Sequence, residues 1–368
     1  MPMVGRWLTW LLNMINLIIT ALKFSLKKWK VFVISFVMVF VMVALPKLGI
    51  TNSSNMMSPV PAKVDIFEQV RPKLEKFTND FKLKKPNYLI PETRAASEYD
   101  QASAYAVIDM DTGEVILNKN LSKKLPIASI TKIMTAVVAL DLAPSVNEEF
   151  TVSEKASEMV PTKVMLKPGE KVSLELLLKS ALLASANDSS QVIKEGLDQL
   201  YGEQVFIEAM NEKAKFLGMN NSHFTNPQGF DDPNHYSSVE DLAILSNYAL
   251  KNYPFIKEIV AKDYEDMNIQ GEIRFYLNNW NGLLGVYPGV SGIKIGNTGD
   301  AGYTTTVISE RAGKRLFAVI LGTPGVLERD LWTSQLLDTG FEMIAGLEPI
   351  NINEEQLRAK YASWKYER

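Results

Sequence analysis

The sequence predicts an α+β domain that follows an N-terminal membrane segment. Strand-like segments occur near residue 104 and again after residue 292, and the long segments between them have helical character. Strands at both ends of a chain with helices between them indicate a sheet assembled from distant parts of the sequence. Ahead of this domain, residues 31–46 form a run without any charged side chain.

The uncharged run is the first predicted element, and it follows a basic patch at residues 23–30. Its length lies between that of a signal-peptide core and that of a membrane-spanning helix, and no A-x-A cleavage pattern follows it. We therefore expect residues 31–50 to form an uncleaved signal anchor, with the basic segment 1–30 at the cytoplasmic side. The alternative, a buried core helix, would need polar neighbours at helical spacing, and the run has none before Lys47.

Residues 7–22 are also uncharged, but they carry a polar stripe at helical spacing, formed by Thr9, Asn13, Asn16 and Thr20. This segment would lie in the membrane interface or span the membrane as the first half of a hairpin. The sequence leaves both topologies open. In either case we expect a protein of the cell membrane, single-pass or with an N-terminal hairpin, whose folded domain is extracytoplasmic.

Residues 51–86 connect the membrane segment to the folded domain. Residues 51–62 are rich in Ser, Asn and Pro, which is typical of an exposed linker. Apolar positions from Phe67 to Phe81 then fit one face of a helix that is started or interrupted at Pro72. We interpret this part as a linker and stalk helix, and a helix docked on the following domain is the alternative.

The folded domain begins with two predicted strands, at residues 104–110 and 114–120. They flank Asp111, Thr112 and Gly113, residue types that favour a tight hairpin turn. Helices are expected at residues 129–142 and 174–200, followed by strands near residues 292–294, 303–309 and 315–321. A closing helix is expected at residues 331–344.

Composition limits the chemistry open to this chain of 368 residues. Its hydrophobic content of 46% and charged content of 22% are ordinary globular values. The absence of cysteine excludes a disulfide scaffold, a thiolate metal site and a cysteine nucleophile. Two histidines, His223 and His235, leave little room for a histidine-rich metal site or a Ser-His-Asp arrangement. The basic residues 1–64 precede a net acidic remainder, which argues against a nucleic-acid partner.

The first candidate for chemistry is Ser129-Ile-Thr-Lys132, which opens a predicted helix and places both side chains on one face. A serine hydroxyl needs a group that accepts its proton, and a desolvated lysine with a lowered pKa can do so where histidine is missing. The helix N-terminus adds a favourable field for an oxyanion. The spacing alone is a weak signal, because Ser25 and Lys28 share it.

The second candidate is Ser185-Ala-Asn187, inside the apolar stretch SALLASANDSSQVI. Polar side chains at this density destabilise an apolar helix unless they form hydrogen bonds or line a cleft. A polar turn between two helices is the structural alternative.

The third candidate is Gly292-Ile-Lys294-Ile-Gly296-Asn-Thr, on a predicted strand. Glycines on both sides of the lysine would let a ligand approach the backbone closely, and the lysine would attract a carboxylate. As an isolated pattern it also fits a plain strand end with a solvated lysine.

Together, the order and spacing of these motifs resemble the penicillin-recognising serine transferases, whose set is S-x-x-K, S-x-N and K-T-G. The stretches PIASITKIMTAVVAL, FLGMNNSHFTNPQGFDDPNHYSSVEDLAIL and GVSGIKIGNTGDAGYTTT resemble D-alanyl-D-alanine carboxypeptidases, the low-molecular-weight penicillin-binding proteins. The resemblance covers residues 87–348 and leaves residues 349–368 as a short tail. It implies a β-lactamase/transpeptidase-like α+β fold, with an antiparallel sheet flanked by helices and a helical subdomain.

The resemblance implies a serine-type D-Ala-D-Ala carboxypeptidase that removes the terminal D-alanine from peptidoglycan stem peptides through an acyl-enzyme. Ser129 would be the acylated nucleophile, Lys132 its general base, and Ser185 the group that relays a proton to the leaving amine. Asn187 would hold Lys132 and the substrate amide. Lys294 would attract the terminal carboxylate and help to keep Lys132 neutral.

The end of the third motif would complete the site. Gly296, Asn297 and Thr298 would bind the substrate along the strand, and the backbone N–H groups of Ser129 and Asn297 would form the oxyanion hole. The resemblance implies no metal and no cofactor, and a structural role for both histidines. The expected partners are a peptidoglycan pentapeptide as substrate and β-lactam antibiotics as covalent inhibitors.

One departure from the family pattern is Ile295, which stands at the position of the family's threonine. Losing that hydroxyl's hydrogen bond to the substrate carboxylate would cost about 1.5 to 3 kcal/mol, roughly ten- to a hundredfold in turnover, unless Thr298 or a water replaces it. A peptidoglycan- or penicillin-binding module with impaired catalysis is therefore one alternative. A serine β-lactamase is another, although no E-x-x-x-N pattern stands between Asn187 and Lys294.

Overall fold

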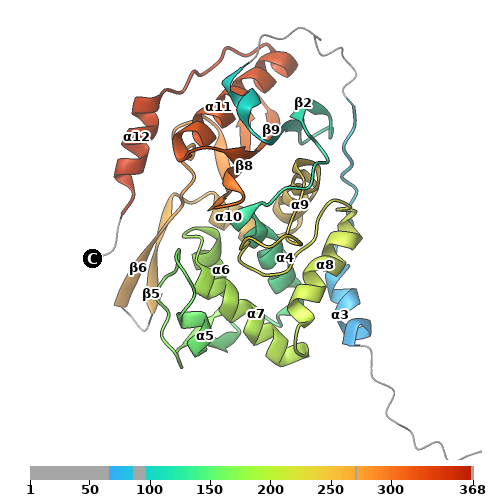
Figure 1. The fold of residues 1–368 in the computed structure, drawn as a ribbon, viewed down its shortest axis with the longest axis vertical. Helices are drawn as coiled ribbons and strands as arrows, with labels where there is room; N and C mark the ends of the chain where they lie inside the picture. Colours follow the sequence, from blue (N-terminus) through green and yellow to red (C-terminus); the bar gives the residue numbers. More distant parts are fainter. Residues whose placement is uncertain (1–65, 86–96, 270–271, 366–368) are drawn as a thin grey trace, which may run out of the picture. The chain divides into compact units, whose positions relative to one another are not determined.

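The computed structural model describes residues 66–85, 97–269 and 272–365, which form one compact unit (Figure 1). The expected basic segment 1–30, signal anchor 31–50 and linker 51–62 lie outside the described residues. None of the described helices is long and apolar enough to cross a membrane.

A five-stranded antiparallel sheet joins early and late parts of the chain, as the sequence predicts. Its strand order is β2-β1-β9-β8-β7. The strands are β1 (Ala104–Asp109), β2 (Val115–Lys119), β7 (Val290–Thr298), β8 (Gly302–Arg311) and β9 (Lys314–Thr323). Ala106 of β1 lies opposite Val319 of β9, so the first and last of these strands in sequence are hydrogen-bonded neighbours. The expectation of an α+β fold with an antiparallel sheet is confirmed.

The turn between β1 and β2 has the chemistry that its sequence predicts. The Asp109 Oδ1 atom accepts the backbone N–H groups of Asp111 at 2.8 Å and Thr112 at 3.0 Å. Gly113 has a φ of +79°, and a Cβ atom there would lie 2.3 Å from the Lys82 carbonyl oxygen. Glycine is therefore required at this point of the hairpin.

Alternating side chains of the sheet enter two different cores. Ala106 and Ile108 of β1 belong to the core shared with the helical subdomain, whereas Tyr105 and Val107 belong to the core on the opposite face. Helix α11 (Val326–Ala345) contacts that second face and includes the closing helix predicted for residues 331–344. The sheet is thus covered by helices on both faces, as Figure 1 shows.

The helical subdomain lies between β2 and β7 in sequence. Its helices are α4 (Lys132–Leu142), α5 (Glu154–Ser157), α6 (Leu174–Leu182), α7 (Asn187–Tyr201), α8 (Val205–Leu217), α9 (Val239–Asn252) and α10 (Pro254–Val260). Two small two-stranded sheets, which the sequence did not reveal, pair β3 (Glu149–Thr151) with β4 (Lys171–Ser173), and β5 (Tyr264–Ile269) with β6 (Glu272–Asn278).

The prediction of one continuous helix over residues 174–200 is wrong, because the structure has two helices there. Helix α6 ends at Leu182 and α7 begins at Asn187. Between them Ser185 has a φ of +61°, a left-handed conformation that a continuous right-handed helix cannot contain. The polar turn considered as an alternative for this segment is therefore present.

Helix α3 (Ile66–Leu74) packs on the subdomain instead of standing apart as a stalk. It contains Pro72 within its last turn, and its Val70 and Leu74 side chains are fully buried against the core. The ammonium group of Lys213 on α8 donates a hydrogen bond to the Leu74 carbonyl and lies 2.7 Å from a carboxylate oxygen of Asp141. A buried cation therefore links α3 to α4 and α8. Of the two alternatives for this segment, the structure has the docked helix.

The segment 349–368, expected as a short tail, contains a further helix. Helix α12 (Glu354–Ser363) begins at an Asn353 cap, whose side chain accepts the Gln356 N–H. Its Leu357 side chain is fully buried beside α11. This end of the chain is therefore part of the fold.

Candidate active site

Three distant segments meet in one cleft of about 580 Å³. They are the 3₁₀ turn η3 (Ala128–Thr131), the turn between α6 and α7, and strand β7. The residues that line the cleft include Ser129, Ser185, Asn187, Ile295, Gly296, Asn297 and Thr298. The structure thus brings together members of all three motifs found in the sequence. A larger hollow of about 900 Å³, beside β3, β4 and β5, contains none of them.

Ser129 and Lys132 are positioned by the junction of η3 with α4. Lys132 is the first residue of α4 and its side chain is fully buried, whereas Ser129 is half-buried at the cleft. The Lys132 Nζ atom lies 2.8 Å from the Ser129 Oγ atom. The predicted helical spacing therefore produces direct contact between a hydroxyl and an amine.

The Lys132 amine has two further partners from other segments. It lies 2.8 Å from the Asn187 Oδ1 atom and 2.9 Å from the Gln228 carbonyl oxygen. Burial lowers the pKa of Lys132 well below its ordinary value, the nearby Lys294 charge lowers it further, and Asp188 acts in the opposite direction. A lysine in this state can accept a proton from the adjacent hydroxyl.

Asn187 and Ser185 are held by the turn between α6 and α7. The Asn187 side-chain amide donates to the Val160 carbonyl at 3.0 Å. Next to it, the Asp188 carboxylate accepts backbone N–H groups of Val164 and Leu166, which fixes the loop that faces the turn. Within the described chain the Ser185 hydroxyl makes no hydrogen bond, so it is available to a bound molecule in the cleft.

Strand β7 approaches the Ser129 backbone closely at Gly296. A Cβ atom at residue 296 would lie 2.7 Å from the Ser129 nitrogen and 2.9 Å from the Ala128 Cβ atom. Only glycine therefore lets this strand pass so near to the serine. Asn297 and Thr298 continue the strand along the wall of the cleft.

Lys294 of β7 is buried, with 2% of its surface exposed, and is not among the residues that line the cleft. Its Nζ atom donates to the Ile295 carbonyl at 3.1 Å. Burial lowers the pKa of Lys294 to about 7, and the charge of Arg329 contributes. The alternative of a solvated lysine at a strand end is therefore wrong.

Ile295 and Thr298 differ in what they offer to a ligand. The half-buried Ile295 lines the cleft with an apolar side chain. The Thr298 hydroxyl donates to the Asp231 Oδ1 atom at 2.5 Å and accepts the Ala301 N–H at 3.2 Å. Because its proton is committed to Asp231, Thr298 does not replace the hydroxyl missing at residue 295 in this conformation.

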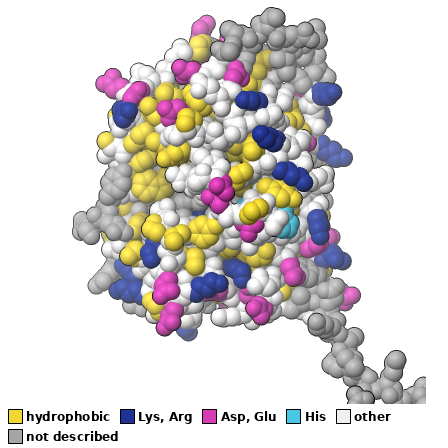
Figure 2. Space-filling view, in the orientation of Figure 1, with side chains coloured by type: hydrophobic (Ala, Val, Ile, Leu, Met, Phe, Trp, Pro, Cys, Tyr) yellow, Lys and Arg dark blue, Asp and Glu magenta, His cyan; other side chains and the backbone are white. Residues whose placement is uncertain are grey.

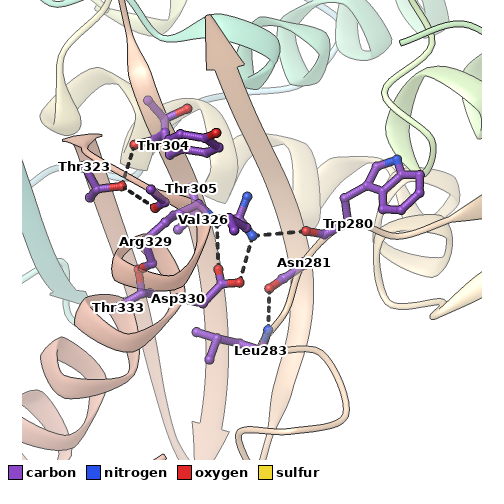
Figure 3. Close-up of polar contacts among 12 residues, drawn as sticks. Trp280, Asn281, Leu283, Thr304, Thr305, Thr323, Val326, Arg329, Asp330 and Thr333 are labelled. Atoms are coloured by element: carbon purple, nitrogen blue, oxygen red, sulfur yellow. Dashed lines mark hydrogen bonds and ion pairs between the residues drawn. The ribbon is translucent and has the colours of Figure 1, made fainter. Parts of the chain in front are cut away.

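Arg329 is a cleft residue that the sequence did not identify. It lies at the start of α11, is 2% exposed, and lines the cleft. Its guanidinium donates to both carboxylate oxygens of Asp330, at 2.7 and 2.8 Å, and to the Trp280 carbonyl at 3.2 Å (Figure 3). Arg329 and Lys294 are the basic side chains of this part of the cleft, which we call its cationic part, and Asp330 offsets the charge of Arg329 in the free protein. An adjacent Arg-Asp pair is common on helices, so no local signal could have assigned Arg329 to the cleft.

The two histidines lie on either side of Gln228 in the sequence. His223 pairs with Tyr236 through backbone hydrogen bonds and is exposed. The buried His235 ring accepts the Thr225 N–H at Nδ1, 3.1 Å away, so its proton is assigned to Nε2, which lies 2.8 Å from the Thr131 Oγ1 atom. His235 therefore braces the turn between Ser129 and Lys132. Among the described residues, no group of three or more His, Asp or Glu side chains is placed to hold a metal ion.

Known proteins similar to this chain in sequence or structure point to one family. A family model described as D-alanyl-D-alanine carboxypeptidase matches residues 92–325. The chain is 35% identical over 246 residues to the D-alanyl-D-alanine carboxypeptidase DacF of Bacillus subtilis. It is 29% identical over 268 residues to DacA of Haemophilus influenzae. These matches cover 66% and 69% of this chain but 62% and 65% of the relatives, so the chain spans less than two thirds of their length.

Solved structures with a similar fold include the Streptomyces K15 DD-transpeptidase, with a TM-score of 0.61 and 26% identity. That match covers 65% of this chain and 97% of the solved chain. Penicillin-binding protein D2 of Listeria monocytogenes, in its ampicillin-bound form, gives a TM-score of 0.59 at 28% identity. It covers 68% of this chain and 100% of the solved chain.

The environment of His235 predicts a specific loss of stability in acid. Burial lowers its pKa to about 4, against an ordinary 6.5, with Asp232 opposing this shift. Above pH 6.5 the ring is neutral in both folded and unfolded chains. As the pH falls from 6.5 towards 4, only the unfolded chain gains the proton, which costs the folded state about 2 kcal/mol at pH 5. His235→Gln, which does not titrate, should remove this contribution.

The test is urea unfolding of the wild-type protein and His235→Gln at pH 7.5 and 5. The unfolding free energy of the wild-type protein, relative to that of His235→Gln, should fall by about 2 kcal/mol between pH 7.5 and pH 5. Parallel pH dependence in both proteins would contradict a neutral, buried His235.

Proposed function

The chain belongs to the D-alanyl-D-alanine carboxypeptidase family, and from this premise we propose that it is a serine-type carboxypeptidase that removes the terminal D-alanine from peptidoglycan stem peptides. The observation that carries the proposal is the 2.8 Å contact between the Ser129 hydroxyl and the buried Lys132 amine. The fold is that of the penicillin-binding DD-peptidases, which supports the same activity.

In the proposed reaction, neutral Lys132 takes the proton of Ser129 while the Ser129 Oγ atom attacks the carbonyl carbon of the scissile amide. The negative charge that develops on the carbonyl oxygen is stabilised by the backbone N–H groups of Ser129 and Asn297. As the C–N bond breaks, the leaving D-alanine amine receives a proton through Ser185. Water then releases the shortened peptide from Ser129 and restores the hydroxyl.

The cationic part of the cleft would bind the terminal carboxylate of the substrate. Arg329 lines the cleft and the buried Lys294 is close enough to lower the pKa of Lys132, so a carboxylate here would be attracted by both basic side chains. Its charge would also favour the protonated form of Lys294, whose pKa is about 7 in the free protein. Asn187 would hold the substrate amide as well as Lys132. Gly296, Asn297 and Thr298 would bind the peptide along β7.

We also propose that β-lactam antibiotics acylate Ser129. The ampicillin-bound form of the Listeria penicillin-binding protein, whose fold this chain shares, supports this extension. A strained lactam carbonyl would occupy the position of the scissile amide, with its carboxylate near Arg329. Nothing in the proposed reaction requires a group other than the chain's own side chains, a peptide and water.

We propose further that the protein is anchored in the cell membrane with its catalytic domain outside. The support is sequence alone: the uncharged run 31–46 after the basic patch at residues 23–30. An extracytoplasmic domain would meet peptidoglycan directly. Proteolysis of intact spheroplasts should therefore shed a fragment that begins within residues 51–62, as read by N-terminal sequencing. Native protein whose first residue follows Pro46 would contradict the retained anchor.

Ser129→Ala should abolish covalent labelling by penicillin, because among the described residues no other hydroxyl forms a hydrogen bond with Lys132. Intact-mass analysis after incubation with a fluorescent penicillin measures this directly. Ser157→Ala, which changes a half-buried serine on α5 outside the cleft, is the matched control and should label like the wild-type protein. A label that persists on Ser129→Ala, or maps to Ser185, would refute the nucleophile.

Ile295→Thr should raise D-alanine release about tenfold, because the added hydroxyl can donate a hydrogen bond to the substrate carboxylate. Thr298 does not supply this donor, since its own hydroxyl donates to Asp231. Acylation by penicillin should change much less, since a strained lactam depends less on placement. Ile273→Thr, at a 56% exposed strand isoleucine outside the cleft, is the matched control. Both rates are measured on the same preparations.

Equal gains on peptide and penicillin, or no gain on the peptide, would show that Ile295 does not limit turnover. Labelling without any D-alanine release from either protein would instead favour a binding module with impaired catalysis.

A further inference from the structure

The C-terminal helix α12 lies beyond the residues that match the family, yet its end reaches the candidate active site. Three sets of contacts hold it there. Leu357 is buried beside α11, and the Tyr361 hydroxyl donates to the Asp330 carboxylate at 2.8 Å. The Lys365 backbone N–H donates to the Asn278 Oδ1 atom of β6 at 2.9 Å. The helix and the residue that follows its end are thus joined to α11 and to β6.

Trp364, which follows α12, builds one wall of the cleft together with Trp280. Their ring centroids lie 4.9 Å apart at an interplanar angle of 84°, and Tyr361 packs on Trp364 at 5.0 Å. Edge-to-face contacts of this kind fix aromatic rings in place. Figure 2 shows hydrophobic side chains gathered in the centre and on the left of this face, the side that carries α12 and the β5–β6 hairpin in Figure 1.

The aromatic wall adjoins the cationic part of the cleft. The Trp280 carbonyl accepts a hydrogen bond from Arg329 (Figure 3). The Trp280 indole N–H donates to the carbonyl of Ala184, the residue before Ser185. Val326, one turn before Arg329 on α11, lines the cleft as well. The wall therefore stands between the proposed proton relay and the proposed carboxylate anchor, which is where the leaving residue of the substrate would lie.

We propose that Trp364 and Trp280 close the leaving-group end of the cleft, so that α12 restricts the released group to a small residue with a free carboxylate. This inference rests on the proposed function, since the leaving group is defined by the cleavage at Ser129. It makes Trp364 a specificity-determining residue.

Two physical effects produce this selection. A side chain larger than the methyl group of D-alanine would have to displace a ring held by Trp280 and Tyr361, and excluded methylene groups change rates about 10- to 200-fold. A leaving group that continues as a peptide would replace the carboxylate by a neutral amide, which loses the charge interaction with Lys294 and with Arg329, whose own partner Asp330 remains. The Trp364 indole N–H is buried and has no hydrogen-bond partner in the described chain, so a ligand would meet the apolar surface of the ring and not its N–H.

The experiment compares two acylated peptides that differ only in the last residue, one ending in D-Ala-D-Ala and the other in D-Ala-D-Leu. The value of kcat/KM is measured for each, and their ratio reports the selection against the larger leaving residue. Trp364→Ala should raise the relative rate of the D-Leu peptide about tenfold or more. Leu357→Ala, which loosens α12 without touching the cleft, should move the ratio in the same direction.

Arg358→Ala is the matched control on α12, because its side chain is 67% exposed and, within the part of the chain that the structure describes, forms an ion pair with Glu354 alone. It should keep the wild-type ratio. An unchanged ratio in Trp364→Ala, or equal losses on both peptides, would overturn the proposal. If the proposal for Trp364 is overturned but the wild-type protein labels with penicillin and releases D-alanine, the proposed function still holds. Wild-type protein that does neither would refute the proposed function itself.

Discussion

The buried amine of Lys132 is the group around which the candidate active site is organised. Its three partners, the Ser129 hydroxyl, the Asn187 side chain and the Gln228 carbonyl, come from three separate segments. A charged ammonium is costly in such a fully buried position, and its pKa is lowered accordingly. The hydroxyl, amide and carbonyl groups therefore surround a neutral amine that can act as a base. The sheet and the helical subdomain hold these segments together.

The fold holds these segments in backbone conformations that are unfavourable on their own. Ala128 and Ser185 have φ values of +49° and +61°, and Gly229 approaches the Ala128 carbonyl so closely that a Cβ atom would lie 1.9 Å from its oxygen. Such conformations persist only where the surrounding structure enforces them. Buried side chains of α4, α6 and α7 provide that support, and the same packing places the hydroxyl of Ser129 at the cleft. Packing of the core thus stabilises the unfavourable backbone conformations that the geometry of the site requires.

Local patterns predicted the parts of the fold whose causes are local. The β1–β2 hairpin follows from Asp109 to Gly113, and the contact of Ser129 with Lys132 follows from a one-turn spacing on a helix start. Arg329, Gln228 and Trp364 were missed because each reaches the cleft only through tertiary packing. The Gln228 contribution is a backbone carbonyl, which no side-chain pattern could reveal. Helix α12 has a capping box that was readable from Asn353 and Gln356, although its docking surface was not.

The central claim is that burial keeps Lys132 neutral when Ser129 reacts, and the pH dependence of the acylation rate constant tests it most directly. The rate constant for penicillin acylation should rise with pH as Lys132 loses its proton and should reach a plateau well below pH 10.5, the ordinary lysine value. A rate constant that keeps rising into the range of an ordinary lysine would contradict the account, because Lys132 would then be charged at neutral pH.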